Sequence, residues 1–351
     1  MSKIIAIANQ KGGVGKTTTT FSLGVALRKQ GNKVLLIDAD PQGDLTTCMG
    51  YYDQDKLQNT IATLMSDTIY DNEVDAEKAI IHHKEGIDLI PANLDLSAIE
   101  FSLVNAMSRE FTLKNSIRDI KDNYDYILID CMPSLGMITI NALACSDKII
   151  IPVQGEYLAA KGMGHLLKTV SRIHKQINPN LKIGGVLLTL VDKRTNLSKQ
   201  VRDTVNNNYG QYVKIYNTEI PKDVNTAKST STGKSIFEFD KNSPVALSYK
   251  ELAKEVLEIN NYISLVCYLT IGCITSKIYR RCKIMEKITE NFIVPNYIAE
   301  EILEYIEQTA QGRCRCMKWE NIRALLGLAI INGRITREQA DVIEKLFCRE
   351  K

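Results

Sequence analysis

The sequence predicts an α/β protein whose main domain is a doubly wound, mostly parallel β-sheet. Short apolar runs alternate with longer segments of helical periodicity over the first 260 residues. These runs are apolar on both faces, which is typical of parallel strands covered by helices on both sides. The chain has 351 residues, of which 44% are hydrophobic and 24% charged, an ordinary balance for one large globular domain or two.

The expected elements alternate regularly along residues 1–260. Strands are expected at 3–8, 33–38, 87–92, 126–130, 148–153 and 182–190. Helices are expected at 17–30, 96–120, 159–177, 197–208 and 245–258. A helix between successive parallel strands must return across a face of the sheet, so this order predicts a sheet with helices on both faces.

The composition changes near residue 260. Six of the nine cysteines lie in residues 261–351, and this part contains 14 basic and 11 acidic residues, so the whole net charge of +3 lies here and 1–260 is neutral. Such a break is typical of a domain boundary. We expect the main α/β domain at 1–260, a linker of unclear structure at 261–284 and a small helical module at 285–351.

The same composition argues against a secreted or membrane-spanning protein. The charged start MSK leads into a short apolar run and then polar residues, unlike a signal peptide. We therefore expect a cytoplasmic protein whose nine cysteines are reduced thiols. The apolar part of the segment 262–284, roughly residues 262–274, is too short to span a bilayer. Either it lies at a membrane interface, backed by Arg280, Arg281 and Lys283, or it is a linker or a helix packed on the main domain.

A glycine-rich loop, NQKGGVGKTTTT at 9–20, follows the first expected strand and opens the first expected helix. This is the context that a phosphate-binding loop requires. Glycine lets backbone N–H groups point at phosphate oxygens, and the following helix dipole favours the negative charge. The residues predicted to bind the nucleotide are Lys11, Gly12, Gly13, Val14, Gly15, Lys16, Thr17 and Thr18.

Three of these side chains have expected roles. Lys16 would reach the β- and γ-phosphates, the Thr17 hydroxyl would hold Mg²⁺, and Thr18 would lie near the α-phosphate. The usual pattern has glycine where this chain has Gln10, and it carries an additional lysine, Lys11. This deviant Walker A motif, KGGVGKT, resembles that of the ParA/MinD ATPases. The resemblance implies a P-loop NTPase fold and an ATP-dependent homodimer in which Lys11 reaches the partner's phosphates and assists catalysis with Lys16.

Two further apolar strands end in carboxylates, at the edge of the sheet where open α/β folds bind ligands. The stretch LLIDADPQGDLT (35–46) carries Asp38 and Asp40, and DYILIDCMPSLG (125–136) carries Asp130. Asp130 has the Walker B arrangement and is expected to bind Mg²⁺ through water. The family resemblance implies that Asp40 positions the attacking water and that Asp38 supports the Mg²⁺ shell. Without the glycine-rich loop, two carboxylates that cap the next helix would be the simpler interpretation.

Within the family, residues 1–258 are most similar to the short, Soj-like partition proteins. The stretches that carry this similarity are DADPQGDLT, IPVQGEYLAAKGMGHLL, VDKRTNLSKQV and EIPKDV. The resemblance implies ATP-dependent, nonspecific binding to DNA, a nucleoid-associated place in the cytoplasm, and a role in partitioning a chromosome, plasmid or mobile element. It also implies a ParB-like centromere-binding partner that stimulates hydrolysis.

The expected DNA-binding residues are Arg194, Lys222 and Lys228. Arg194 matches one basic position of the family, but the second family arginine falls at Asn225 here. Lys222 and Lys228 flank Asn225, and because phosphate binding is a charge effect, a shifted lysine can substitute. The alternative for each of the three is a solvated surface charge.

Two other functions stay open at this stage. A MinD-like membrane-positioning ATPase would need a C-terminal amphipathic helix with a basic polar face, for which only 262–284 is a candidate. A nucleotide-switched adaptor with little turnover would keep the loop without efficient hydrolysis. His82, His83, His165 and His174 show no metal-ligand grouping, and Cys314-x-Cys316 lacks a second pair.

Overall fold

The computed structural model describes residues 2–154, 159–192, 202–206 and 213–271. The chain divides into two compact units, Met1–Val256 and Leu257–Lys351. Most of the second unit, including the expected module at 285–351 and part of the expected linker, lies outside the described residues. None of the described helices has the length and apolarity that crossing a membrane requires.

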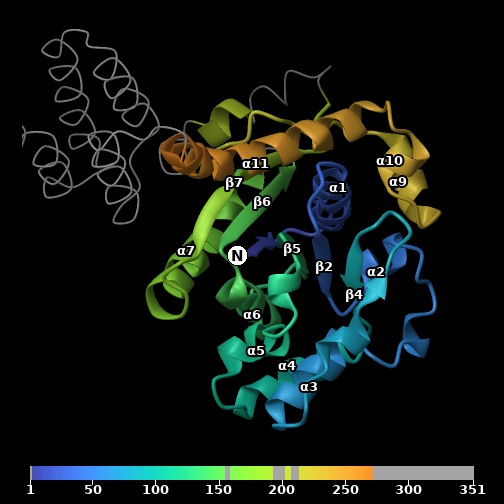
Figure 1. The fold of residues 1–351 in the computed structure, drawn as a ribbon, viewed down its shortest axis with the longest axis vertical. Coiled ribbons are helices and arrows are strands. Elements are labelled where there is room, and N and C mark those ends of the chain that lie inside the picture. Colours follow the sequence, from blue (N-terminus) through green and yellow to red (C-terminus); the bar gives the residue numbers. More distant parts are fainter. Residues whose placement is uncertain (1, 155–158, 193–201, 207–212, 272–351) are drawn as a thin grey trace, which may run out of the picture. The chain divides into compact units, whose positions relative to one another are not determined.

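The first unit is built on a seven-stranded sheet (Figure 1). Its strands are β1 (Lys3–Ile7), β2 (Val34–Ala39), β3 (Ile81–His82), β4 (Asp88–Ile90), β5 (Tyr126–Cys131), β6 (Lys148–Gln154) and β7 (Lys182–Thr189). They lie in the order β3-β4-β2-β5-β1-β6-β7. All pairings are parallel except that of β3 with β4. The doubly wound, mostly parallel sheet is therefore confirmed, with all six expected strands and one additional short strand, β3.

Helices cover both faces of this sheet. They are α1 (Lys16–Lys29), α2 (Asp44–Cys48), α3 (Ile61–Ile69), α4 (Leu96–Asn105), α5 (Thr112–Ser116), α6 (Met137–Cys145), α7 (Ala159–Gln176), α9 (Val224–Ser231), α10 (Ile236–Phe239) and α11 (Pro244–Ile271). Short 3₁₀ turns occupy Gln54–Lys56, Ala76–Ala79, Arg109–Phe111 and Lys121–Asn123. Figure 1 shows α1 and α11 on one side of the sheet and α3 to α6 on the other. Alternate strand residues point to these two layers, as the apolar runs predict.

Two expected helices differ in extent from the prediction. The segment 96–120 is broken between α4 and α5, where Ser108 adopts a φ of 49° in the left-handed region. Helix α11 begins at Pro244 and continues to Ile271, so its backbone is helical through the first part of the expected linker. Of the expected helix at 197–208, the described part, 202–206, is helical.

Tight packing of α1 on the sheet fixes the loop that precedes it. A Cβ atom at Gly24 would lie 2.7 Å from Leu36 Cδ2, so α1 approaches β2 more closely than any side chain at residue 24 allows. The strands that flank the loop are buried along almost their whole length. The phosphate-binding loop therefore starts from a rigid strand and ends in a rigid helix.

Candidate nucleotide site

The glycine-rich loop leaves β1 and enters α1 in the expected way. Gly13 and Gly15 adopt left-handed φ angles of 71° and 80°, which glycine adopts without strain. A Cβ atom at Gly12 or Gly13 would meet no other atom within 4 Å, so the inner face of the loop is open. Gly15 is the N-cap of α1, and the free N–H groups of the first turn point out of the helix next to this opening. The backbone is thus arranged as an anion cradle.

The two lysines of the motif are held across the loop. Lys16 is buried, and its Nζ atom donates a hydrogen bond to the backbone oxygen of Lys11 at 3.5 Å. Lys11 is half-buried, and its Nζ atom lies 3.5 Å from Oε1 of Gln154, at the end of β6. Asn9 ties the same strand to the loop because its Nδ2 atom donates to the Pro152 oxygen at 2.6 Å. Both ammonium groups therefore lie at the carboxyl end of the central strands.

Side chains distant in sequence brace the loop and its helix. The Thr189 hydroxyl, at the end of β7, donates to the Val14 oxygen at 2.8 Å. Inside α1, the Thr19 hydroxyl lies 3.1 Å from the hydroxyl of Tyr249 on α11, and both residues are buried. The sequence gives no signal for these contacts, since a lone threonine at a strand end and a tyrosine on a later helix carry no motif. They hold the loop and its helix from two separate elements, β7 and α11.

Asp130 lies beside the loop at the end of β5. It is buried, and its Oδ1 atom accepts a hydrogen bond from the Thr20 hydroxyl at 3.3 Å. Its Oδ2 atom is buried and has no hydrogen-bond partner among the described residues. Burial, and next the charge of Asp38, raise the pKa of Asp130, whereas a hydrogen bond from Thr17 lowers it. Oδ2 of Asp130 is therefore a buried acceptor that a bound cation would satisfy.

Asp38 lies opposite Asp130, because the two residues are register partners on β2 and β5. Its Oδ2 atom accepts hydrogen bonds from the Thr46 backbone N–H at 2.9 Å and from the Thr46 hydroxyl at 2.7 Å. Its Oδ1 atom accepts from the Asp40 N–H at 3.2 Å. Burial raises the pKa of Asp38 to about 7, and the Thr46 hydrogen bonds oppose that rise. Both oxygens thus hold the loop between β2 and α2, which makes Asp38 a positioning residue for Asp40.

Asp40 is the more accessible carboxylate of this loop. It is half-buried, and its Oδ1 atom accepts a hydrogen bond from the Gln42 N–H at 3.0 Å. Burial raises the pKa of Asp40, and the nearby Lys16 charge partly opposes the rise. Of the three carboxylates, Asp40 therefore combines contact with solvent and proximity to Lys16, as a residue that orients a water molecule requires.

The loop after β5 is held by a residue that the sequence did not indicate. Glu100, on α4, accepts a hydrogen bond from the Met137 N–H at 2.9 Å. A Cβ atom at Gly136 would lie only 2.0 Å from Glu100 Oε1, so a side chain there would displace the Glu100 carboxylate, whereas the φ of −72° suits any residue. Ser134 accepts at its backbone oxygen from the Thr139 hydroxyl at 2.8 Å. The loop between β5 and α6 is thereby attached to α4.

These residues fit Mg²⁺ bound together with a nucleotide. No group of three or more His, Cys, Asp or Glu side chains in the described part of the chain could hold a metal by itself. Mg²⁺ does not need one, because it usually takes one or two carboxylates and completes its shell with phosphates and water. Thr17 and Asp130 would hold the ion. A place for Asp38 in its shell stays a prediction.

The three cysteines that precede α11 take no part in this site. Cys131 and Cys145 are buried, and burial raises the pKa of both thiols, so they are inert packing groups. Cys48 on α2 is partly buried, and burial raises the pKa of its thiol to about 12.

Comparison with known proteins agrees with this geometry. A family model described as an AAA domain matches residues 2–183. The sporulation initiation inhibitor protein Soj of Bacillus subtilis is 47% identical over 256 residues, which cover 73% of this chain and 98% of that protein. The chromosome partitioning protein ParA of Caulobacter vibrioides is 40% identical over 257 residues, covering 73% and 94%. The chain belongs to the ParA/Soj family of ATPases.

A solved structure supports the same nucleotide chemistry. The cobyrinic acid a,c-diamide synthase of Mycobacterium smegmatis, crystallised with ADP and magnesium, superposes with a TM-score of 0.64 at 36% identity, covering 73% of this chain and 94% of that one. Together with the loop geometry, these similarities identify the chain as a ParA/Soj-family ATPase that uses ATP and Mg²⁺.

The residues expected to bind DNA are only partly described. Arg194 lies outside the described residues. Lys222 and Lys228 are both exposed, just before α9 and within it. Asn225, where the ParA/Soj family has its second arginine, lies in the first turn of α9, and its Nδ2 atom is 3.5 Å from Oδ2 of Asp240. Lys222 precedes α9 and Lys228 lies within it, and their role in DNA binding stays a prediction.

Helix α9 is joined to the nucleotide site through α2. The backbones of Gly50, just after α2, and Gly233, just after α9, meet so closely that a Cβ atom at Gly233 would lie 2.6 Å from the Gly50 Cα. The Tyr52 hydroxyl donates to the Ser231 oxygen at 3.3 Å. Since α2 directly follows the Asp40 loop, one short stretch of chain connects the carboxylate to α9.

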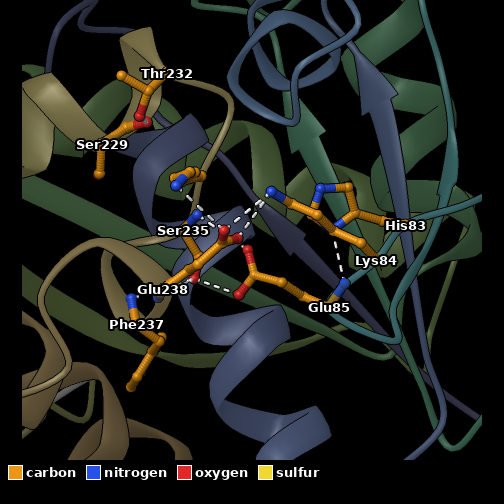
Figure 2. A network of polar contacts seen from close by, with 9 residues as sticks. His83, Lys84, Glu85, Ser229, Thr232, Ser235, Phe237 and Glu238 are labelled. Carbon is orange, nitrogen blue, oxygen red and sulfur yellow. Dashed lines mark hydrogen bonds and ion pairs between the residues drawn. The ribbon is translucent and has the colours of Figure 1, made fainter.

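A polar network fixes the following helix, α10, to the sheet (Figure 2). Glu85, in the loop between β3 and β4, accepts hydrogen bonds from the Ser235 N–H at 3.0 Å and from the Ser235 hydroxyl at 2.5 Å. Glu238 on α10 pairs with Lys84 at 3.0 Å and with Lys234 at 3.5 Å. These contacts join segments 150 residues apart and fix α10 to the loop between β3 and β4.

Proposed function

We propose that the chain is a DNA-partition ATPase: it forms an ATP-dependent homodimer, binds DNA without sequence preference and is released when ATP is hydrolysed. The observation that carries this proposal is Lys11, a second lysine held at the open side of the phosphate loop. Similarity to Soj and ParA over nearly the whole of those proteins supports the same function.

The side chains have separate tasks in the proposed reaction. Lys16, and Lys11 of the opposite protomer, neutralise the charge that develops on the transferred phosphoryl group. Asp40 accepts a hydrogen bond from the attacking water and holds it in line. Asp38 keeps the Asp40 loop in place through Thr46. Thr17 and Asp130 would hold Mg²⁺, which would supply further charge neutralisation.

The proposal extends to partners and domains. DNA contacts fall to Arg194, Lys222 and Lys228, and a ParB-like centromere-binding protein stimulates hydrolysis. The protein acts in the cytoplasm on the nucleoid. Residues 1–260 form the ATPase domain, and 285–351 form a separate helical module joined by 261–284. A MinD-like membrane role and a slow adaptor role are the alternatives that the experiments must separate.

DNA binding by the purified full chain tests the proposal. Binding is measured with ATP, with ADP and with a non-hydrolysable ATP analogue, each at two salt concentrations. Binding that requires ATP or the analogue, ignores DNA sequence and weakens with salt is the expected result, because phosphate contacts release counterions. Absence of DNA binding in every nucleotide state would refute the DNA-partition function, and binding to anionic vesicles instead would favour the membrane alternative.

A further inference from the structure

A basic hollow lies between the end of α1, the end of α10 and the first turns of α11. Its volume is about 370 Å³. Three exposed lysines line it: Lys29 from α1, Lys241 from the segment after α10 and Lys250 from α11. Its other lining residues are uncharged. We name this feature the lysine hollow.

The positive charge of the lysine hollow is not neutralised by carboxylates nearby. None of the ion pairs within the described residues includes Lys29, Lys241 or Lys250. The Lys29 Nζ atom lies 5.8 Å from the centre of the Phe237 ring, a contact that holds the ammonium group at the wall without cancelling its charge.

The acids of the neighbouring segment are engaged elsewhere. Glu238 pairs with Lys84 and Lys234 on the side of the β3–β4 loop (Figure 2). Asp240 accepts hydrogen bonds from the Asn242 N–H at 3.3 Å and from Asn225 at 3.5 Å. Although residues 1–260 are neutral as a whole, this place is locally cationic.

We propose that the lysine hollow binds the phosphate backbone of DNA. This inference rests on the proposed DNA-partition function and gives it a specific surface. The hollow adjoins the position of the absent arginine, because Asn225 contacts Asp240 and Lys241 is the next residue. Lysine binds phosphate as a point charge, so a cluster displaced along the same edge can replace a lost contact.

The shape of this surface favours a polyanion over a lipid bilayer. A helix that lies in a membrane interface needs a continuous apolar face. At the start of α11, Val245, Ala246 and Tyr249 are buried in the protein, and the large apolar residue that remains exposed there is Leu247. Leu247 and the half-buried Phe237 ring are the large apolar groups that line the hollow, and exposed Phe239 lies on the same short helix as Phe237. These separate groups beside three lysines fit a sugar–phosphate backbone, which needs charge and little apolar area.

Salt-dependent DNA binding by the full chain tests the lysine hollow. The variant combines Lys29→Gln, Lys241→Gln and Lys250→Gln and is measured with a non-hydrolysable ATP analogue on random-sequence DNA. If all three lysines contact phosphates, the log–log salt slope falls by about 0.9 for each, and affinity at low salt drops by at least about tenfold. Basal ATP hydrolysis is unchanged because none of the three contacts the nucleotide loop.

The matched control removes the same charge from other helices and turns. It combines Lys114→Gln on α5, Lys121→Gln in a 3₁₀ turn and Lys175→Gln on α7, so both variants lose three positive charges. This control should keep the wild-type slope. As a second readout, bound DNA should protect Lys241 and Lys250 from amine acetylation more than it protects Lys175.

Each other outcome has a definite meaning. Equal slopes for the two triple variants would overturn the lysine hollow while the DNA-partition function stands. Lack of DNA binding by the wild type in every nucleotide state would overturn both. If the hollow variant binds DNA normally but loses binding to vesicles rich in anionic lipid, the surface is a membrane contact and the DNA assignment is wrong.

Discussion

Thr46 offers the sharpest test of how the Asp40 loop is held. Its hydroxyl donates to Asp38 Oδ2 at 2.7 Å and accepts from the Ala92 N–H at 3.1 Å, and all three residues are fully buried. Thr46→Val keeps the shape of the side chain and removes both contacts. The Ala92 N–H is then left without a partner, at a cost of about 1–3 kcal/mol, and the charged contact to Asp38 is worth a similar ~1.5–3 kcal/mol.

The combined loss is about 2.5–6 kcal/mol, a large part of the ~5–15 kcal/mol by which a domain is stable. The free energy of unfolding is measured by urea titration of the full chain, and ATP hydrolysis is measured in parallel. We expect a large drop in stability and slower turnover, since the Asp40 loop loses one of its supports.

Thr46→Ser is the matched control. It retains the hydroxyl and loses one buried methyl group, which costs about 1 kcal/mol. The free energies of unfolding of Thr46→Val and Thr46→Ser are compared by urea titration. If they agree within about 0.5 kcal/mol, the hydrogen bonds of the Thr46 hydroxyl do not hold this loop.

Four further substitutions test other parts of the site. Lys11→Ala should abolish ATP-dependent dimerisation, seen by light scattering, while the monomer still binds ATP; a normal dimer would exclude a role across the interface. Asp40→Ala should leave a DNA-bound dimer whose hydrolysis is on the order of a hundredfold slower, and wild-type turnover would refute the assignment. Gly136→Ala should slow hydrolysis because its Cβ atom meets Glu100, and adding Glu100→Ala should restore part of the rate. Lys148→Gln should stabilise the protein by about 1 kcal/mol at pH 7, because burial and neighbouring lysines lower the pKa of Lys148 to about 8. Between pH 8 and 10 the unfolded chain still binds the Lys148 proton whereas the folded chain releases it, so the advantage of the variant in stability should shrink as the pH rises. A stability difference between variant and wild type that stays constant over this range would contradict the reasoning.

Much of the fold follows from the apolar runs alone. Strands buried on both faces carry continuous Ile, Leu and Val, so β1, β2 and β5 could be predicted with the helices between them. β3 was missed because two residues, Ile81 and His82, are too few for any pattern. The break at Ser108 was missed because no glycine or proline marks it.

The candidate site divides in the same way. Lys16, Thr17 and Asp130 belong to local motifs, and the structure places them together. Glu100 and Thr189 act through single hydrogen bonds to residues that are 37 and 175 positions away. The spacing of residues in the sequence does not indicate contacts of this kind. Local sequence thus indicates what touches the nucleotide, whereas the supports of those residues become visible only in three dimensions.

The meeting of Gly50 with Gly233 has a consequence for how this protein can diverge. Because two backbones touch there, the junction between the Asp40 loop and α9 does not depend on the side chains that α9 presents. Substitutions on the surface of α9, such as Asn225→Arg, would change the charge of that surface and leave the contact between Gly50 and Gly233 in place. A ParA/Soj-family ATPase built in this way can change its binding surface by surface substitution alone, while the junction next to its nucleotide site stays the same.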